Sequence, residues 1–246
     1  MDKDEKLTVL GHLEDLRNRV MWAALAVAIG TVASFVFAEE IIDILKSVAS
    51  DVELQAIVPT EMISTYFKLS LMCGIGLATP VITYEIVMFI RPALTSSERR
   101  YLYLLLPSVL IAFVIGVVFA YLVMVPPAIN FLFNFGSGVA TIEWRIGNYI
   151  NVVTRLIIAI GLCFETPIII YFLTKIGIVT AQKLSHFRRF AIVGAFIIAA
   201  IITPTFDPVN QIIVAVPLIV LYEAGIILSR IAGRNKKVPV WETDES

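Results

Sequence analysis

The sequence has very few residues that build metal sites or disulfides. It contains only two cysteines and two histidines in 246 residues. Cys73 and Cys163 lie inside apolar runs, whereas His12 and His186 lie in polar connections. No Cys/His spacing typical of a zinc site occurs. We therefore expect no disulfide framework, no metal and no cofactor.

Motifs of nucleotide and intramembrane protease chemistry are also absent. The sequence has no G-x-x-x-x-G-K-[ST] loop, which excludes phosphate-loop nucleotide hydrolysis by this chain. Gly74-Ile75-Gly76 lies inside an apolar run and not at a helix start. The apolar runs contain neither Asp nor His, so intramembrane protease pairs are missing. We do not expect an enzyme.

Apolar sequence dominates instead. Hydrophobic residues make up 59% of the chain and the mean hydropathy is +0.88, against roughly 45–50% apolar residues in ordinary globular domains. A membrane-spanning helix needs about 20 apolar residues. We predict an all-α integral membrane protein with six transmembrane helices, the last two of them short. They are Val20–Ala38, Ser64–Ile90, Tyr101–Val125 (ended by Pro126-Pro127), Tyr149–Leu173, Phe190–Thr203 and Gln211–Ser229.

The first of these runs also follows basic residues, as the core of a signal peptide does. It is longer than the usual core of about 7–15 residues, so we expect it to be retained. The whole of residues 1–230 is predicted to form one transmembrane domain, with a polar and disordered tail at 231–246.

The distribution of Lys and Arg predicts the orientation. Of the 19 such residues, Lys46 and Arg145 lie in connections on one side, and Lys68 and Arg155 lie near outer ends of spans. The remaining fifteen lie in connections or tails on the other side. Because cytoplasmic loops are rich in Lys and Arg, both termini are predicted to be cytoplasmic.

Two outer connections have one apolar helical face. In Glu39–Val48 this face is Ile41, Ile42, Leu45 and Val48, and Pro127–Phe135 is similarly apolar on one side. We predict interfacial helices that cap the periplasmic side of the spans.

Glu165 lies deep within the fourth apolar run, beside Pro167. A bare charge near the bilayer centre costs on the order of 3 kcal/mol, and no cation lies within four residues to offset it. Glu165 is therefore expected to be neutral, paired with another helix, or exposed to a wet cavity. A functional role competes with a purely structural one, that of a protonated and hydrogen-bonded side chain.

Two predicted cytoplasmic segments mix carboxylates with arginines. One is HLEDLRNR at 12–19 and the other is LTSSERR at 94–100. Carboxylates accept an arginine fork in a way that lysine does not imitate, so this surface suits an arginine-bearing peptide. The alternative is local ion pairing, which contributes only about 0–1 kcal/mol per exposed pair.

Other polar residues lie within or beside the predicted spans. Glu61 precedes Lys68 by seven residues, which places both on one helical face where they can pair. Glu85 lies near the inner end of the second span, and Glu223 lies about midway along the sixth. Asp207 and Gln211 flank the outer turn between the last two spans.

Taken together, these motifs resemble the TatC family, the multispanning core of the twin-arginine protein translocase, from about Leu10 to Arg230. Each motif is weak alone, but their order on six spans is specific. They are HLEDLRNR (12–19), PTE (59–61), FKLSL (67–71), TPVITYE (79–85), FIRPALTSSERR (89–100), FAYLVMVP (119–126), FETPI (164–168), ITPTFDPVNQ (202–211) and LYEAGIILSR (221–230).

The resemblance implies a receptor and scaffold in a prokaryotic inner membrane. TatC-like proteins bind signal peptides with paired arginines and help to export folded proteins, driven by the proton-motive force. By resemblance, the signal-peptide site comprises Glu14, Asp15, Arg17, Arg19, Glu98 and Arg99. A second site, where small single-span partners of TatA or TatB type meet the core, comprises Glu165, Pro167, Pro204, Asp207, Gln211 and Glu223. Self-association within the complex is also implied.

The sequence departs from the family pattern at several positions. Asp15 stands where many relatives carry Glu, Glu85 stands where Gln is frequent, and Arg91 replaces a smaller residue. An alternative of another class is a secondary transporter in which Glu165 and Glu223 relay protons or bind a cation. The lack of a clear internal repeat disfavours that alternative.

Overall fold

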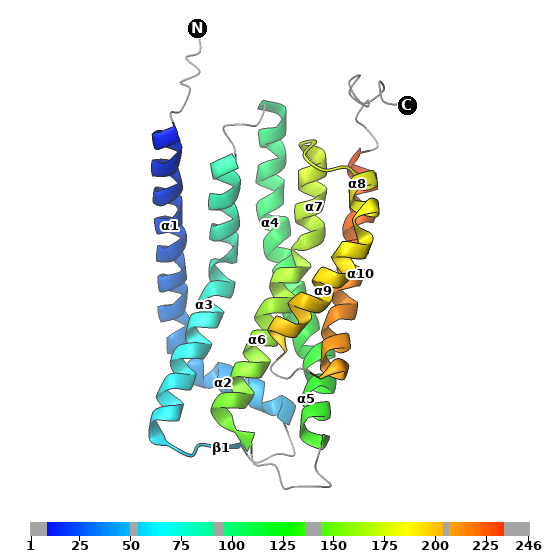
Figure 1. The fold of residues 1–246 in the computed structure, drawn as a ribbon. Helices are drawn as coiled ribbons and strands as arrows, with labels where there is room; N and C mark the ends of the chain where they lie inside the picture. The colour runs from blue at the N-terminus through cyan, green and yellow to red at the C-terminus, as the bar shows by residue number, and fades with distance from the viewer. Residues whose placement is uncertain (1–8, 50–53, 91–95, 136–143, 204–206, 234–246) are drawn as a thin grey trace.

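The computed structural model is a bundle of long helices that run between two ends of the molecule (Figure 1). It describes residues 9–49, 54–90, 96–135, 144–203 and 207–233. The elements in chain order are α1 (Val9–Val36), α2 (Ala38–Lys46), η1 (Ser47–Ala49), β1 (Leu54–Gln55), α3 (Pro59–Ile90), α4 (Ser96–Phe119), η3 (Ala120–Met124), α5 (Val125–Asn134), β2 (Trp144–Arg145), α6 (Ile146–Phe164), α7 (Thr166–Lys175), α8 (Ala181–His186), α9 (Arg188–Ile202) and α10 (Pro208–Gly233).

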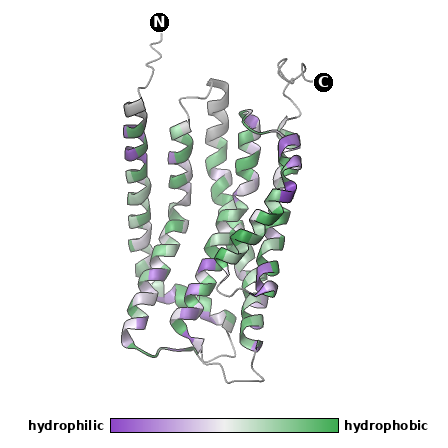
Figure 2. Ribbon diagram, viewed as in Figure 1, coloured by the Kyte–Doolittle hydropathy of each residue, from purple (hydrophilic) through white to green (hydrophobic). Residues whose placement is uncertain are grey.

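The described part of the chain contains five stretches long and apolar enough to cross a membrane. They are Leu13–Val36, Pro59–Phe89, Leu104–Asn134, Ile146–Lys175 and Pro208–Gly233. Polar residues gather toward the two ends of the bundle, and apolar residues fill the middle (Figure 2). The start of α1 and the end of α10 lie at the same end, hereafter the termini end (Figure 1).

The last two predicted spans differ from each other in length. Helix α9 has 15 residues and is short, as predicted. The prediction that the sixth span is also short is wrong, because α10 has 26 residues and accommodates Pro217 internally. It continues through Gly233, three residues past the predicted domain boundary at 230.

The third predicted span does not end at the proline pair. Instead, α4 passes through the π-helical turn η3 into α5, and both prolines occupy the first turn of α5. A proline has no backbone N–H to donate, and in the turn directly before the pair the N–H of Val125 donates a hydrogen bond to the carbonyl oxygen of Ala120, which shifts the hydrogen-bond register there. The wider turn gives the backbone a way to adjust just before them.

At the end opposite the termini, hereafter the outer end, α2 lies across the bundle, whereas α5 continues the line of α4 and η3 (Figure 1). Helix α2 buries Ala38, Ile42 and Leu45, and α5 buries Ala128 and Ile129. The hydroxyl of Tyr149 donates a 2.8 Å hydrogen bond to the carbonyl oxygen of Leu45 and so ties α6 to α2. The helix predicted at 39–48 is confirmed and buries one face, whereas the helix predicted at 127–135 is instead the end of the third long apolar stretch, Leu104–Asn134.

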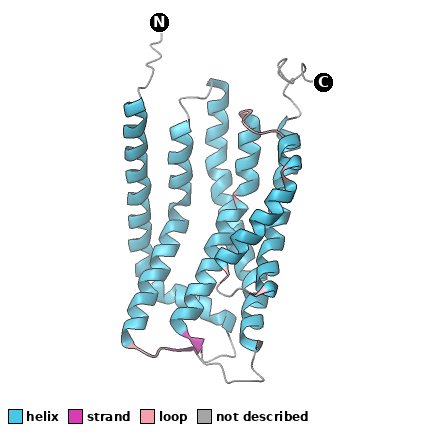
Figure 3. Ribbon diagram, in the orientation of Figure 1, coloured by secondary structure: helices cyan, strands magenta, loops and turns pink. Residues whose placement is uncertain are grey.

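A short parallel strand pair joins two connections at this end (Figure 3). Leu54 of β1 pairs with Trp144 of β2, and Gln55 pairs with Arg145. Glu61 does not pair with Lys68. Its carboxylate accepts hydrogen bonds from the backbone N–H groups of Ile57 (3.1 Å) and Gly147 (3.2 Å).

Helices α1 and α3 touch almost backbone to backbone. A Cβ built on Gly30 of α1 would lie 2.8 Å from the carbonyl oxygen of Gly74 on α3, and one on Gly74 would lie 2.8 Å from Cα of Thr31. Small residues at such crossings let helices approach closely inside a membrane. This crossing matters because α1 leaves most of its apolar surface uncovered.

Candidate functional site

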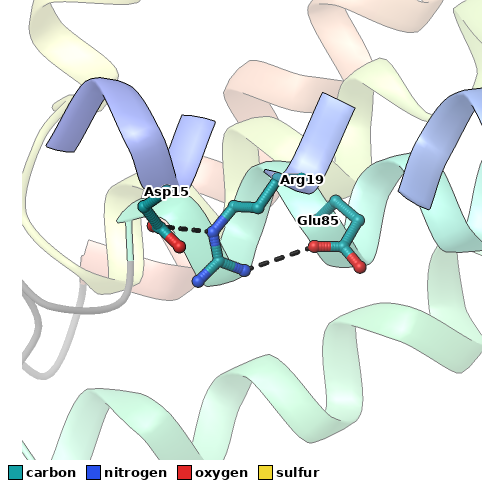
Figure 4. Close-up of polar contacts among 3 residues, drawn as sticks. All are labelled: Asp15, Arg19 and Glu85. Carbon is teal, nitrogen blue, oxygen red and sulfur yellow. Dashed lines mark hydrogen bonds and ion pairs between the residues drawn. The ribbon is translucent and has the colours of Figure 1, made fainter. Parts of the chain in front are cut away.

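Three charged side chains meet near the termini end, on α1 and α3 (Figure 4). Nε of Arg19 donates a 2.8 Å hydrogen bond to Oδ2 of Asp15, one turn earlier on α1. Nη1 of Arg19 donates a 3.3 Å hydrogen bond to Oε2 of Glu85, on α3. The two carboxylates come from different helices, and together they hold one guanidinium group.

Glu14 and Arg17 lie on the exposed side of the same helix. Their side chains are 69% and 68% exposed, and 3.7 Å separates Arg17 Nη2 from Glu14 Oε1. A pair of this kind contributes little to stability. For the segment at 12–19 the structure therefore contains the local ion pairs weighed as an alternative in the sequence, but the link from Arg19 to Glu85 is not local.

Two other residues assigned to this end by resemblance are only partly described. Glu98 and Arg99 lie in the first turn of α4, and their side chains lie outside the described residues. Helices α3 and α4 are in contact, so the start of α4 and the end of α3, which carries Glu85, belong to the same region of the bundle.

Glu165 lies at a break between two helices. Helix α6 ends at Phe164 and α7 starts at Thr166, with Pro167 in the first turn of α7. The proline ring cannot donate a backbone hydrogen bond, which accounts for the interruption. The Glu165 side chain is 4% exposed, and among the described residues its Oε1 has no hydrogen-bond partner. The predicted isolated carboxylate is therefore buried within the protein.

Asp207 and Gln211 organise the turn between α9 and α10. Oδ1 of Asp207 accepts a 2.7 Å hydrogen bond from the backbone N–H of Asn210, as an N-cap residue does. Nε2 of Gln211 donates to the carbonyl oxygen of Phe196 on α9 (3.0 Å). Pro204 lies outside the described residues. The two described side chains thus stabilise the turn of the α9–α10 hairpin.

Glu223 pairs with an arginine of the neighbouring helix. Nε and Nη2 of Arg188 lie 2.9 Å and 3.0 Å from the two carboxylate oxygens of Glu223, in a bidentate pair that joins α9 to α10. Both side chains are partly exposed. No hydrogen bond among the described residues links Glu223 to Glu165, so the structure does not assemble the two-glutamate relay of the transporter alternative.

An apolar groove of about 520 Å³ lies between α1, α2, α3, α4 and α6. Ser34 and Thr154 line it. Both side chains are 3% exposed, and their hydroxyls have no partner among the described residues. Leu45 and Tyr121 place the groove toward the outer end.

Glu85 is the residue that sequence reasoning left out of the site. Its position near the inner end of a span was noted, but spacing along one helix cannot show which side chain of another helix it meets. The crossing of Gly30 and Gly74 was missed as well. The signal that points to it is the small residue at a matching depth in two adjacent spans.

The helices and the polar contacts described above identify the general class of this protein. Long apolar helices, charged contacts near the ends and a buried carboxylate at a helix break are the features of a polytopic membrane protein. The family model of the Sec-independent protein translocase protein (TatC) matches residues 11–217.

Relatives and solved structures agree with that match. The chain is 41% identical to the Sec-independent protein translocase protein TatC of Aquifex aeolicus, over 92% of this chain and 96% of the relative. It is 36% identical to the chloroplastic TATC of Pisum sativum, over 94% of this chain but 66% of the pea protein's length. A crystal structure of the twin-arginine translocase receptor TatC matches with a TM-score of 0.80 and 39% identity, over 90% of this chain and 99% of that one.

The chain belongs to the TatC family of Sec-independent, twin-arginine protein translocases. It is therefore a membrane component of a protein transport system.

Proposed function

We propose that this chain is the signal-peptide receptor and core scaffold of a twin-arginine translocase. Asp15, Glu14 and Glu98 bind the paired arginines of the signal peptide at the termini end, with Arg17, Arg19 and Arg99 shaping the surrounding charge. The observation that carries the proposal is the guanidinium held between Asp15 and Glu85, because carboxylates from two helices form a natural receptor for arginine.

The proposed topology places both termini in the cytoplasm and includes α9 as a sixth, short span. Fifteen helical residues rise roughly 22 Å, which is less than the hydrocarbon thickness of about 30 Å. A short span is accommodated by local thinning of the bilayer. The location that follows is the inner membrane of a prokaryotic cell.

The proposed partner site lies around Glu165 and the α9–α10 hairpin. A buried carboxylate without a described partner is suited to accept a hydrogen bond from a polar group on another transmembrane helix. Pro167 lies in the first turn after the break, and Asp207 and Gln211 fix the turn of the α9–α10 hairpin, whose helix α10 packs against α7. Single-span proteins of TatA or TatB type are the proposed partners. The chain has a binding and assembly role and no catalytic one, and the proton-motive force drives transport.

The test is binding of a synthetic signal peptide to the purified chain in lipid nanodiscs. The peptide has two consecutive arginines before an apolar segment, and its control has two lysines. We expect strong preference for arginine and loss of binding in Glu98→Ala, with normal membrane insertion of that variant. Equal binding of both peptides by the parent chain would overturn the receptor role.

A further inference from the structure

The guanidinium of Arg19 already occupies a site built for arginine. It donates to Asp15 at 2.8 Å and to Glu85 at 3.3 Å, and the three side chains are between 14% and 31% exposed. Figure 4 shows the guanidinium between the two carboxylates, with Asp15 on its own helix and Glu85 on α3. The chain thus contains an internal copy of the chemical group that the proposed ligand carries.

We propose that Arg19 is a resident occupant of the arginine site, which a signal-peptide arginine must displace from Asp15 and Glu85. This inference rests on the proposed receptor function. It gives Arg19 a role of its own: the residue sets the affinity threshold for the peptide by competing for the same two carboxylates.

The contacts of Arg19 are suited to exchange. Only one oxygen of each carboxylate accepts a hydrogen bond from Arg19, and no other hydrogen bond between described residues reaches the carboxylate of Asp15 or of Glu85. The contact to Glu85, at 3.3 Å, is also longer than the usual 2.7–2.9 Å of a charge-assisted hydrogen bond. The guanidinium is therefore held in place without a bidentate fork to either partner.

The charges of the cluster favour replacement of Arg19 by the ligand arginine over binding of both guanidinium groups at once. Asp15 and Glu85 carry two negative charges and Arg19 carries one positive charge, so the cluster retains one net negative charge. An incoming guanidinium is attracted to that charge but repelled by Arg19 at short range. When Arg19 swings into solvent, which its partial exposure permits, the ligand guanidinium gains both carboxylates.

Arg19→Gln should therefore bind the paired-arginine peptide roughly tenfold more tightly than the parent chain, the effect of one charge-assisted hydrogen bond that no longer has to be broken. The paired-lysine peptide should gain by the same factor, because the energy needed to displace Arg19 does not depend on the ligand. The measurement is the dissociation constant of each labelled peptide with the full chain in nanodiscs.

Arg188→Gln is the matched control. It removes the same charge and breaks an interhelical ion pair, the one to Glu223, outside the proposed peptide site. We expect its peptide affinity to stay within about twofold of the parent. A similar gain in both variants would mean that net charge alone is responsible, and this would overturn the inference.

Arg19→Lys answers the question if Arg19→Gln does not fold. It keeps the positive charge, but a single ammonium cannot hold both carboxylates in the planar arrangement of a guanidinium. A smaller gain in affinity is expected. Unchanged or weaker binding in both Arg19 variants, with arginine preference intact in the parent, would refute the resident role and leave the receptor function standing.

Glu85→Gln distinguishes two roles of Glu85: a carboxylate that both Arg19 and the ligand use, and one that only joins α1 to α3. In the Arg19→Gln background no resident competes, so loss of Glu85 should weaken peptide binding by roughly tenfold. In the parent background it weakens the hold on both Arg19 and the ligand, and the net change should be small. Equal effects in the two backgrounds would show that Arg19 and the ligand do not share Glu85.

Discussion

Because the carboxylate of Glu165 is buried and has no described partner, we expect a substitution that introduces a positive charge there to be harmful. Its side chain is 4% exposed at a break between α6 and α7. Glu165→Gln keeps the shape and a hydrogen-bonding end, so this variant should accumulate normally and retain most export of a twin-arginine reporter. Glu165→Lys places a cation there at a cost on the order of 3 kcal/mol and should abolish export.

Reporter activity in the periplasm, together with the membrane level of each variant, measures the difference. Glu39→Lys, at an exposed position on α2, controls for the charge change itself. Equal loss of export in the Gln and Lys variants would show that the ionised carboxylate is used.

Glu61 stabilises the outer end through the backbone. Its two carboxylate oxygens accept hydrogen bonds from the N–H groups of Ile57 and Gly147, so Glu61→Ala should cost about 1–3 kcal/mol. The melting temperature in detergent reports the loss. Ser64→Ala, which removes only an exposed hydroxyl bonded within α3, should change stability by less than about 0.5 kcal/mol. Identical melting of the two variants would contradict this role.

At the scale of elements, the close crossing of α1 and α3 depends on two glycines. Gly74→Val should separate the helices, because even a Cβ at Gly74 meets the backbone of Thr31. Overpacking of this kind costs roughly 1–3 kcal/mol. Since α1 has few other buried contacts, it is the helix expected to detach.

The check is crosslinking between cysteines introduced on α1 and α3, together with the melting temperature. Gly194→Ala on α9 is the control, since nothing lies within 4 Å of a Cβ built there. If Gly74→Val and Gly194→Ala showed the same crosslinking yield and the same melting temperature, the crossing would not be what holds α1 against α3.

Most helices could be predicted from the sequence, because long apolar runs admit few other structures in a membrane. Their ends could not. Helix α1 starts eleven residues before the predicted Val20, since a helix can extend into water when its polar face carries pairs such as Asp15–Arg19. The proline pair at 126–127 predicts the end of a helix, but the π-helical turn before it lets the helix continue.

The sequence predicts the contacts of the candidate site only where both residues lie on the same helix. Asp15 and Arg19 are four residues apart, so their pairing follows from helical spacing. The approach of Glu85 depends on which helices are neighbours and on their depth, and local spacing contains neither. Glu61 and Lys68 share a helical face. Nevertheless, the Glu61 carboxylate accepts a hydrogen bond from the backbone N–H of Gly147, 86 residues away.

At the scale of the whole molecule, the proposed orientation has a direct test. Glu40 on α2 and Gln182 on α8 are exposed and lie at opposite ends of the bundle. In a chain whose Cys73 and Cys163 are replaced by serine, Glu40→Cys should react with a membrane-impermeant thiol reagent added to intact cells with a permeabilised outer membrane.

Gln182→Cys should react only after the inner membrane is opened. The extent of labelling, read by a gel shift before and after lysis, gives the side of each position. The opposite pattern would reverse the proposed orientation and place the Asp15–Arg19–Glu85 cluster on the wrong side for a cytoplasmic ligand.

The crossing of Gly30 and Gly74 is also the point about which α1 is free to tilt with the least loss of packing. The outer end is braced by α2, by the β1–β2 pair and by the hydrogen bond from Tyr149 to Leu45, whereas Arg19 joins α1 to α3 at the other end. Asp15 lies fifteen residues from Gly30, an arm of roughly 22 Å. A tilt of about 10° around the glycine pair would move Asp15 by roughly 4 Å, which is about the width of a side chain.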